Sequence, residues 1–139
     1  MRVKCISQKL DEDQNYKLYR NSKAKEYSHI TLGKEYPVFG LSFLFDSEGN
    51  GCFVQILSDY DHLLSIPIAL FEIIDKRMSV FWEFKRFNDD CLTLWPSSFY
   101  RDYYHDDLFE GVPDIVADFY NVKLKILNEF PSIQARGTI

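Results

Sequence analysis

Between residues 36 and 95 the sequence is a succession of short apolar runs, each ended by a turn, and helical periodicity appears only after residue 112. The longest run, 36–45, is rich in aromatic residues, which favour strands. The turn cluster 46–51 and the returning run 52–57 follow it, so we expect a hairpin. Further runs of strand length are 2–6, 63–66, 69–74, 80–84 and 92–95. Short strands with brief turns indicate an antiparallel sheet.

One long helix is predicted near the end of the sequence, over residues 113–129. Pro113 suits the first helical position and Asp114 the positive end of the helix dipole. Apolar residues then recur at helical spacing until Pro131: Ile115, Val116, Phe119, Val122, Ile126, Leu127 and Phe130. A short helix over 98–105 is a weaker prediction, and the polar segment 11–25 is expected to be an exposed loop or a short helix. Pro37 predicts an edge strand or a strand start, because proline cannot donate to a sheet.

These elements predict an α+β fold in a single domain, residues 1–139. We expect a strongly bent antiparallel sheet or a small SH3-like barrel, with the C-terminal amphipathic helix packed on it. A chain of 139 residues can bury a core without covalent cross-links. The three cysteines form no CxxC or Cys/His pattern, and no apolar run has the length of a signal peptide or a membrane span. A cytoplasmic protein that does not contact a membrane is therefore expected.

Charge is distributed unevenly along this acidic chain, whose net charge is −5. Residues 89–118 contain eight acidic residues and one basic residue, Arg101. The basic segment 17–34 is diluted by acids, so direct binding to nucleic acid is not expected. The acidic segment favours a positively charged partner, although a solvated acidic face is the plainer alternative.

A catalytic site is not expected from the sequence. Gly49 and Gly51 lack the lysine and the strand-to-helix context of a phosphate-binding loop. The three histidines lie in polar or turn segments, away from an activated nucleophile. We therefore expect neither an enzyme nor a bound cofactor or metal. One alternative stays open, a metal-dependent hydrolase that uses His105, Asp106 and Asp107.

The candidate partner-binding residues combine carboxylates with aromatic rings in the acidic segment. Carboxylates attract and orient a basic protein, and aromatic rings provide anchors that lose water on binding. The alternative is that these rings are core residues and the acids only keep the surface soluble. The candidates are Asp102, Tyr103, Tyr104, Asp106, Asp107, Phe109, Glu110 and Asp114.

Residues 32–84 contain a Gly-Lys-x-Tyr start to a strand, a proline followed by a Phe-Glu segment, and a strand that contains tryptophan. These features are Gly33-Lys34-Glu35-Tyr36, Pro67 with Phe71-Glu72, and Trp82. With these features the segment resembles bacterial immunity proteins, which are encoded beside polymorphic toxins and include those of contact-dependent growth inhibition systems. The resemblance implies a cytosolic inhibitor that blocks the active site or the substrate surface of one cognate toxin, often a basic nuclease. A homodimeric interaction module that uses the Pro37 strand is a further alternative.

Overall fold

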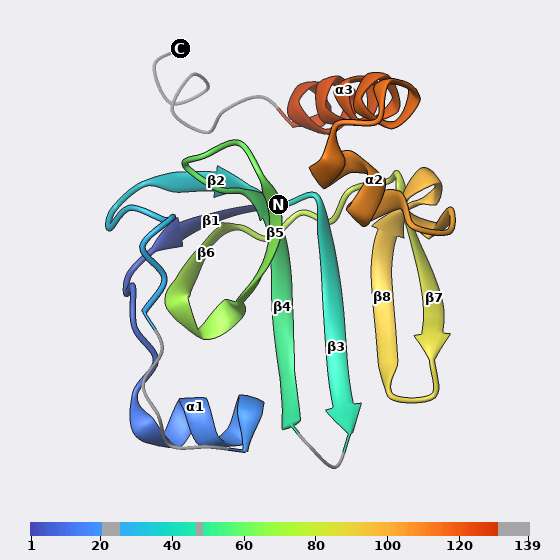
Figure 1. Cartoon of the computed structure of the whole chain (residues 1–139). Helices are drawn as coiled ribbons and strands as arrows, with labels where there is room; N and C mark the ends of the chain where they lie inside the picture. The colour runs from blue at the N-terminus through green and yellow to red at the C-terminus, as the bar shows by residue number, and fades with distance from the viewer. Residues whose placement is uncertain (21–25, 47–48, 131–139) are drawn as a thin grey trace.

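The computed structural model describes residues 1–20, 26–46 and 49–130. These residues form an α+β fold with two antiparallel sheets (Figure 1). The three-stranded sheet has the order β2 (Glu35–Pro37), β1 (Arg2–Cys5), β6 (Phe71–Asp75). The five-stranded sheet has the order β5 (Leu63–Pro67), β4 (Gly49–Leu57), β3 (Gly40–Asp46), β8 (Cys91–Pro96), β7 (Trp82–Asn88). The helices are α1 (Glu12–Tyr19), α2 (Tyr104–Glu110) and α3 (Pro113–Glu129), with short 3-10 turns η1 (Ile68–Leu70) and η2 (Ser97–Tyr100).

The predicted class, a bent antiparallel fold with a C-terminal helix packed on it, is confirmed, but the sheets do not close into a barrel. The prediction of one continuous strand over 36–45 is wrong. This run supplies β2 to one sheet and β3 to the other, and the chain crosses between them at Val38 and Phe39. The Val38 N–H donates to the Met1 carbonyl and the Phe39 N–H to the Gln55 carbonyl, so consecutive amides bond to different sheets.

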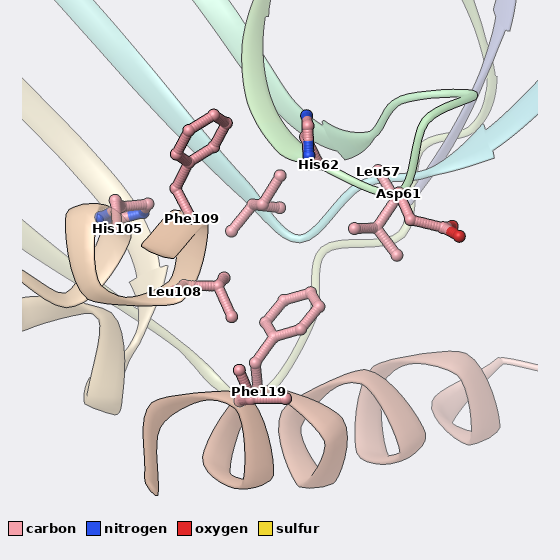
Figure 2. Close-up of a pocket in the computed structure, with 9 residues that line it drawn as sticks. Leu57, Asp61, His62, His105, Leu108, Phe109 and Phe119 are labelled. Carbon is pink, nitrogen blue, oxygen red and sulfur yellow. The ribbon is translucent and has the colours of Figure 1, made fainter. Parts of the chain in front are cut away.

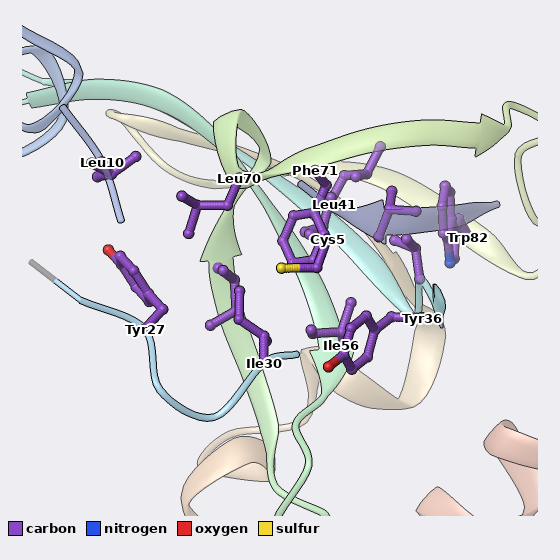
Figure 3. Close-up of a cluster of buried hydrophobic side chains, with 14 residues drawn as sticks. Cys5, Leu10, Tyr27, Ile30, Tyr36, Leu41, Ile56, Leu70, Phe71 and Trp82 are labelled. Carbon is purple, nitrogen blue, oxygen red and sulfur yellow. The ribbon is translucent and has the colours of Figure 1, made fainter. Parts of the chain in front are cut away.

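A first hydrophobic core fills the space between the two sheets (Figure 3). Tyr36 and Phe71 come from the outer strands of the three-stranded sheet, and Leu41 and Ile56 come from the five-stranded sheet. Trp82, at the start of β7, closes one end of this core, and its indole N–H donates to the Phe39 carbonyl at 2.9 Å. This core therefore holds the two sheets together.

A second core lies on the opposite face of the five-stranded sheet. Neighbouring residues of a strand point to opposite faces, and accordingly Leu94 packs against the first core whereas Trp95 belongs to the second. The helical segments supply most of this second core: Phe99, Tyr104, Ile115, Phe119 and Ile126. The predicted helix 113–129 is confirmed at both ends, and it packs through its Ile115, Phe119 and Ile126 face.

The weaker predictions are confirmed only in part. The segment 98–105 is divided between η2 and the start of α2. The polar segment 11–25 contains α1, which begins with a capping box between Asp11 and Gln14, and residues 21–25 lie outside the described part of the chain. Pro37 lies in the edge strand β2, as predicted. None of the described helices has the length and the apolar character needed to span a bilayer.

Candidate partner-binding surface around α2

Helix α2 presents a mixed acidic and aromatic face to solvent. Asp106 and Glu110 are four residues apart, so they lie one above the other on the helix, and Phe109 is next to them on the same side. All three are exposed, and Phe109 keeps 66% of its surface accessible. Leu108 and Tyr104 lie on the inner side and pack in the second core. The helical period thus gathers three of the predicted contact residues on one face.

Asp102 and Tyr103 extend this face just before α2 begins. Both are exposed, and the Tyr103 side chain is 76% accessible. Tyr103 has a φ of 61°, in the left-handed region that side chains other than glycine rarely adopt. Such a conformation costs on the order of 1–3 kcal/mol and is concentrated at functional sites in proteins. The Tyr103 carbonyl accepts from the Asp107 N–H at 2.8 Å, which fixes this residue at the start of the helix.

Tyr104 is not part of the surface, and its assignment as a contact residue is wrong. Its side chain is only 1% exposed and packs on Phe99 in the second core. The hydroxyl donates to Asp118 Oδ2 at 2.8 Å. Burial, together with this carboxylate, raises the pKa of Tyr104 above its usual range. Sequence reasoning grouped Tyr104 with Tyr103 because they are adjacent, but the turn into α2 directs the two rings to opposite sides.

The other two predicted contact residues lie at the margin of this face. Asp107 is half-buried on the flank of α2, so it is less accessible than Asp106. Asp114 is exposed in the first turn of α3, where a carboxylate stabilises the helix dipole. We use the name α2 surface for the exposed set Asp102, Tyr103, Asp106, Phe109 and Glu110.

His105 lies beneath the α2 surface and contacts the five-stranded sheet. Its Nε2 is 3.1 Å from Nε2 of Gln55 in β4, and its ring packs on Trp95 with centroids 4.9 Å apart. Burial lowers the pKa of His105, and the nearby Asp106 opposes this effect. The neutral ring can accept the amide hydrogen of Gln55 at Nε2, whereas a protonated ring would place an Nε2–H donor against this amide donor.

A hollow lies on each side of His105. The larger, about 520 Å³, is bounded by Trp95, Tyr100 and Phe87 and, from the α2 surface, by Asp102, Tyr103 and Asp106. Arg101 also borders this hollow, so its wall carries both signs of charge. The Trp95 indole N–H is buried and has no hydrogen-bond acceptor among the described residues. This hollow combines aromatic walls with polar groups, as small binding sites do.

The second hollow, about 210 Å³, lies between α2, α3 and the turn from β4 to β5 (Figure 2). Phe109 and Leu108 from α2, Phe119 from α3, and His62 from the turn surround it. The rings of His62 and Phe109 pack with centroids 4.8 Å apart. Sequence reasoning missed His62 and Phe87 because they are distant in the chain, and no local signal places them beside α2.

The geometry does not gather the residues of the hydrolase alternative. The His105 ring faces Gln55 inside the fold, whereas Asp106 is exposed on the outer face of α2. Within residues 1–20, 26–46 and 49–130, no three His, Cys, Asp or Glu side chains lie close enough together to hold a metal ion.

No family model, curated protein or solved structure matches this chain.

The burial of His105 predicts a pH effect on stability. Because its pKa in the folded chain is below the unfolded value of about 6.5, the unfolded chain binds this proton more tightly. We therefore expect the contribution of His105 to stability to be complete above that pH, and to be lost as the pH falls from it through the lower pKa of the folded chain. NMR titration of the ring in the folded chain should give a pKa below that of the urea-unfolded chain. A higher value in the folded chain would contradict the placement of this ring.

Proposed function

We propose that this chain is a binding protein that neutralises a basic protein partner through the α2 surface, in the manner of a bacterial immunity protein. The observation that carries the proposal is the exposed face of α2, where Asp106, Glu110 and Phe109 lie together beside two hollows. Acidic side chains interleaved with exposed rings are suited to a partner rich in Lys and Arg.

The arrangement supports a division of roles within the α2 surface. Asp102, Asp106 and Glu110 are exposed carboxylates, and their field speeds the encounter with a positively charged protein. Phe109 and Tyr103 are exposed rings that can lose water against the partner, as anchor residues of interfaces do. The hollows beside them offer recesses for partner side chains.

Helix α3 offers additional apolar area next to this face. Val116 borders the smaller hollow and begins a row of exposed apolar residues at helical spacing. Tyr120 and Leu124 continue this row, with 60% and 41% of their surfaces accessible. An apolar row beside a charged face matches the usual composition of an interface, with an apolar centre and a polar rim.

The kind of partner follows from the chain's charge and from its resemblance to immunity proteins. An acidic chain of this size suits the occlusion of a basic toxin domain, for which a nuclease is the leading candidate. Such inhibition needs no chemical step, because the bound chain only has to cover the active site or the substrate surface of the toxin.

A first experiment identifies the partner. The chain is co-expressed with the product of the adjacent gene, and the two are purified through a tag on the chain. We expect a one-to-one complex with a basic protein whose toxicity is suppressed by the chain. If the adjacent product neither binds the chain nor is neutralised by it, the proposal fails.

A second experiment tests the α2 surface in that complex. The double variant Asp106→Lys/Glu110→Lys reverses two exposed charges on one helix face, whereas the half-buried Asp107 is left unchanged. We expect association at low salt to be roughly tenfold slower or more, because long-range attraction is lost. Stopped-flow measurements over a range of salt concentrations give the rate.

The matched control is Glu26→Lys/Glu72→Lys, which makes the same change in net charge at two exposed sites away from α2. This control should keep most of the wild-type rate. Equal slowing in both double variants would mean that only the total charge matters, and it would remove α2 from the interface.

A further inference from the structure

Strand β7 forms an open edge of the five-stranded sheet (Figure 1). Within the described residues it pairs only with β8, and every residue of it after Trp82 is exposed. An open strand edge is a template for pairing with another chain. Its register with β8 is regular from Trp82 to Arg86 and shifts before Asn88, so the regular part is five residues long and is centred on Phe84.

The backbone of Phe84 is directed toward this open edge. The Glu83 carbonyl accepts from the Tyr100 hydroxyl at 2.8 Å, and the Lys85 carbonyl accepts from the Thr93 hydroxyl at 3.2 Å. Both carbonyls therefore point toward β8. Because successive peptide groups of a strand point in alternate directions, the N–H and C=O of Phe84 point away from β8 and can bond to a further strand.

The side chains of β7 are complementary to a second copy of the same strand. If two β7 strands run antiparallel about a two-fold axis at Phe84, Phe84 lies opposite its own copy, and Glu83 lies opposite Lys85 of the other chain. Opposite charges and aromatic rings placed across a strand pair stabilise it. Within one chain Glu83 and Lys85 form an ion pair of 3.4 Å, and Lys85 Nζ also lies 4.6 Å from the centroid of the Tyr100 ring. About half of each charged side chain is exposed, so both are accessible for such contacts.

An incompletely covered apolar face continues inward from Phe84. Phe84 is paired with Leu94, and Leu94 with Leu41 of the first core, so the three side chains share one face of the sheet. Phe84 and Phe45 on this face are 63% and 43% exposed. Pairing at β7 would bring the two copies of this face together along one continuous sheet.

We propose that two copies of the chain associate through antiparallel pairing of β7 with β7, centred on Phe84. The pairing joins two five-stranded sheets into a single sheet of ten strands. Lysine on an edge strand normally discourages pairing, and in this register each Lys85 meets Glu83 of the other copy. The inference is independent of the proposed function, because it depends on β7 and not on the α2 surface.

Two charge reversals test both the contact and its register. In Glu83→Lys and in Lys85→Glu, each taken alone, like charges face one another at both cross-strand positions of the dimer. We expect each variant to raise the dimer dissociation constant about tenfold or more, because two favourable pairs become unfavourable. Sedimentation equilibrium over a range of concentrations gives the constant, and circular dichroism checks that each variant is folded.

An equimolar mixture of the two variants provides the decisive measurement. Each altered position then faces the opposite charge, so a heterodimer of about wild-type affinity should form. Glu72→Lys and Lys76→Glu make the same changes in net charge at exposed sites on or beside β6, and they should leave dimerisation unchanged. The proposal is overturned if the wild type stays monomeric near 1 mM, if the single variants dimerise as the wild type does, or if the mixture does not restore the dimer.

Discussion

Replacing Phe99 with Ala is expected to lower the free energy of unfolding by about 3–5 kcal/mol, the usual cost of removing a buried aromatic side chain. Phe99 is 1% exposed and its ring packs on those of Trp95, Tyr104, His105 and Phe119. It therefore contacts the sheet, α2 and α3 at once, and the cavity left by its removal cannot be filled by one neighbour. Urea unfolding followed by circular dichroism measures the loss.

Phe109→Ala is the matched comparison for Phe99→Ala. It removes the same number of atoms, but Phe109 lies in α2, whereas Phe99 lies in η2, and Phe109 is 66% exposed. We expect its effect on stability to stay within about 0.5 kcal/mol, as for most surface changes, while its effect on partner binding is larger. A loss in Phe99→Ala as small as that expected for Phe109→Ala would mean that Phe99 does not hold α2 and α3 against the sheet.

Trp82→Ala is expected to lower the free energy of unfolding by roughly 3–5 kcal/mol, as Phe99→Ala does, but for a different structural reason. Trp82 packs in the first core, yet its indole N–H donates to the carbonyl of Phe39, whose side chain belongs to the second core. The substitution thus removes buried apolar surface and also a buried hydrogen bond at the point where the chain crosses between the sheets.

Trp82→Phe separates these two contributions. It keeps most of the apolar contact and leaves the Phe39 carbonyl without its donor, which costs about 1–3 kcal/mol when the acceptor is buried. Differential scanning calorimetry of the wild type, Trp82→Ala and Trp82→Phe gives the loss of stability in each variant. The loss in Trp82→Phe measures the hydrogen bond, and the additional loss in Trp82→Ala measures the apolar contact. If Trp82→Phe is as stable as the wild type, the hydrogen bond does not stabilise the crossing between the sheets.

The elements with a strong local signal were predictable from the sequence. The helix 113–129 has an apolar period, a proline at its start and a proline after its end, and it forms at the predicted residues. The hairpin of β3 and β4 follows from two apolar runs and the turn between them, but both strands extend into the turn predicted over 46–51, because β3 ends at Asp46 and β4 begins at Gly49. Residues 47–48 lie outside the described part of the chain. In both cases the determining interactions are between residues close in the chain.

The division into two sheets was not predictable in the same way. The run 36–45 contains no turn cluster, and although Pro37 and Gly40 flank the crossing at Val38 and Phe39, neither residue indicates that the chain changes sheet there. The crossing is fixed by hydrogen bonds with residues that are distant in the chain. The backbone N–H groups of Val38 and Phe39 donate to the carbonyls of Met1 and Gln55, and the Trp82 indole donates to the Phe39 carbonyl. A local pattern cannot report such contacts.

The α2 surface was also only partly predictable, because local sequence patterns do not report contacts between distant residues. The exposure of Asp106 and Glu110 could be expected from their charge, but the helix over 104–110 that places them on one face with Phe109 was not predicted. The inward position of Tyr104 depends on the left-handed backbone at Tyr103, which the sequence does not indicate. The hollow beside His62 depends on the packing of a turn, a helix start and a second helix, so only the assembled fold reveals it.

The position of β1 in the middle of the three-stranded sheet has a consequence for the order of assembly. Its two partners, β2 and β6, pair with β1 and not with each other, and β6 ends at Asp75. Both edges of residues 2–5 can therefore be bonded only after synthesis has passed Asp75, the last residue of β6. Such distant pairing slows folding, because loop-closure entropy is lost before contacts are gained. Shortening the chain by its first five residues would remove the one strand to which both outer strands are attached.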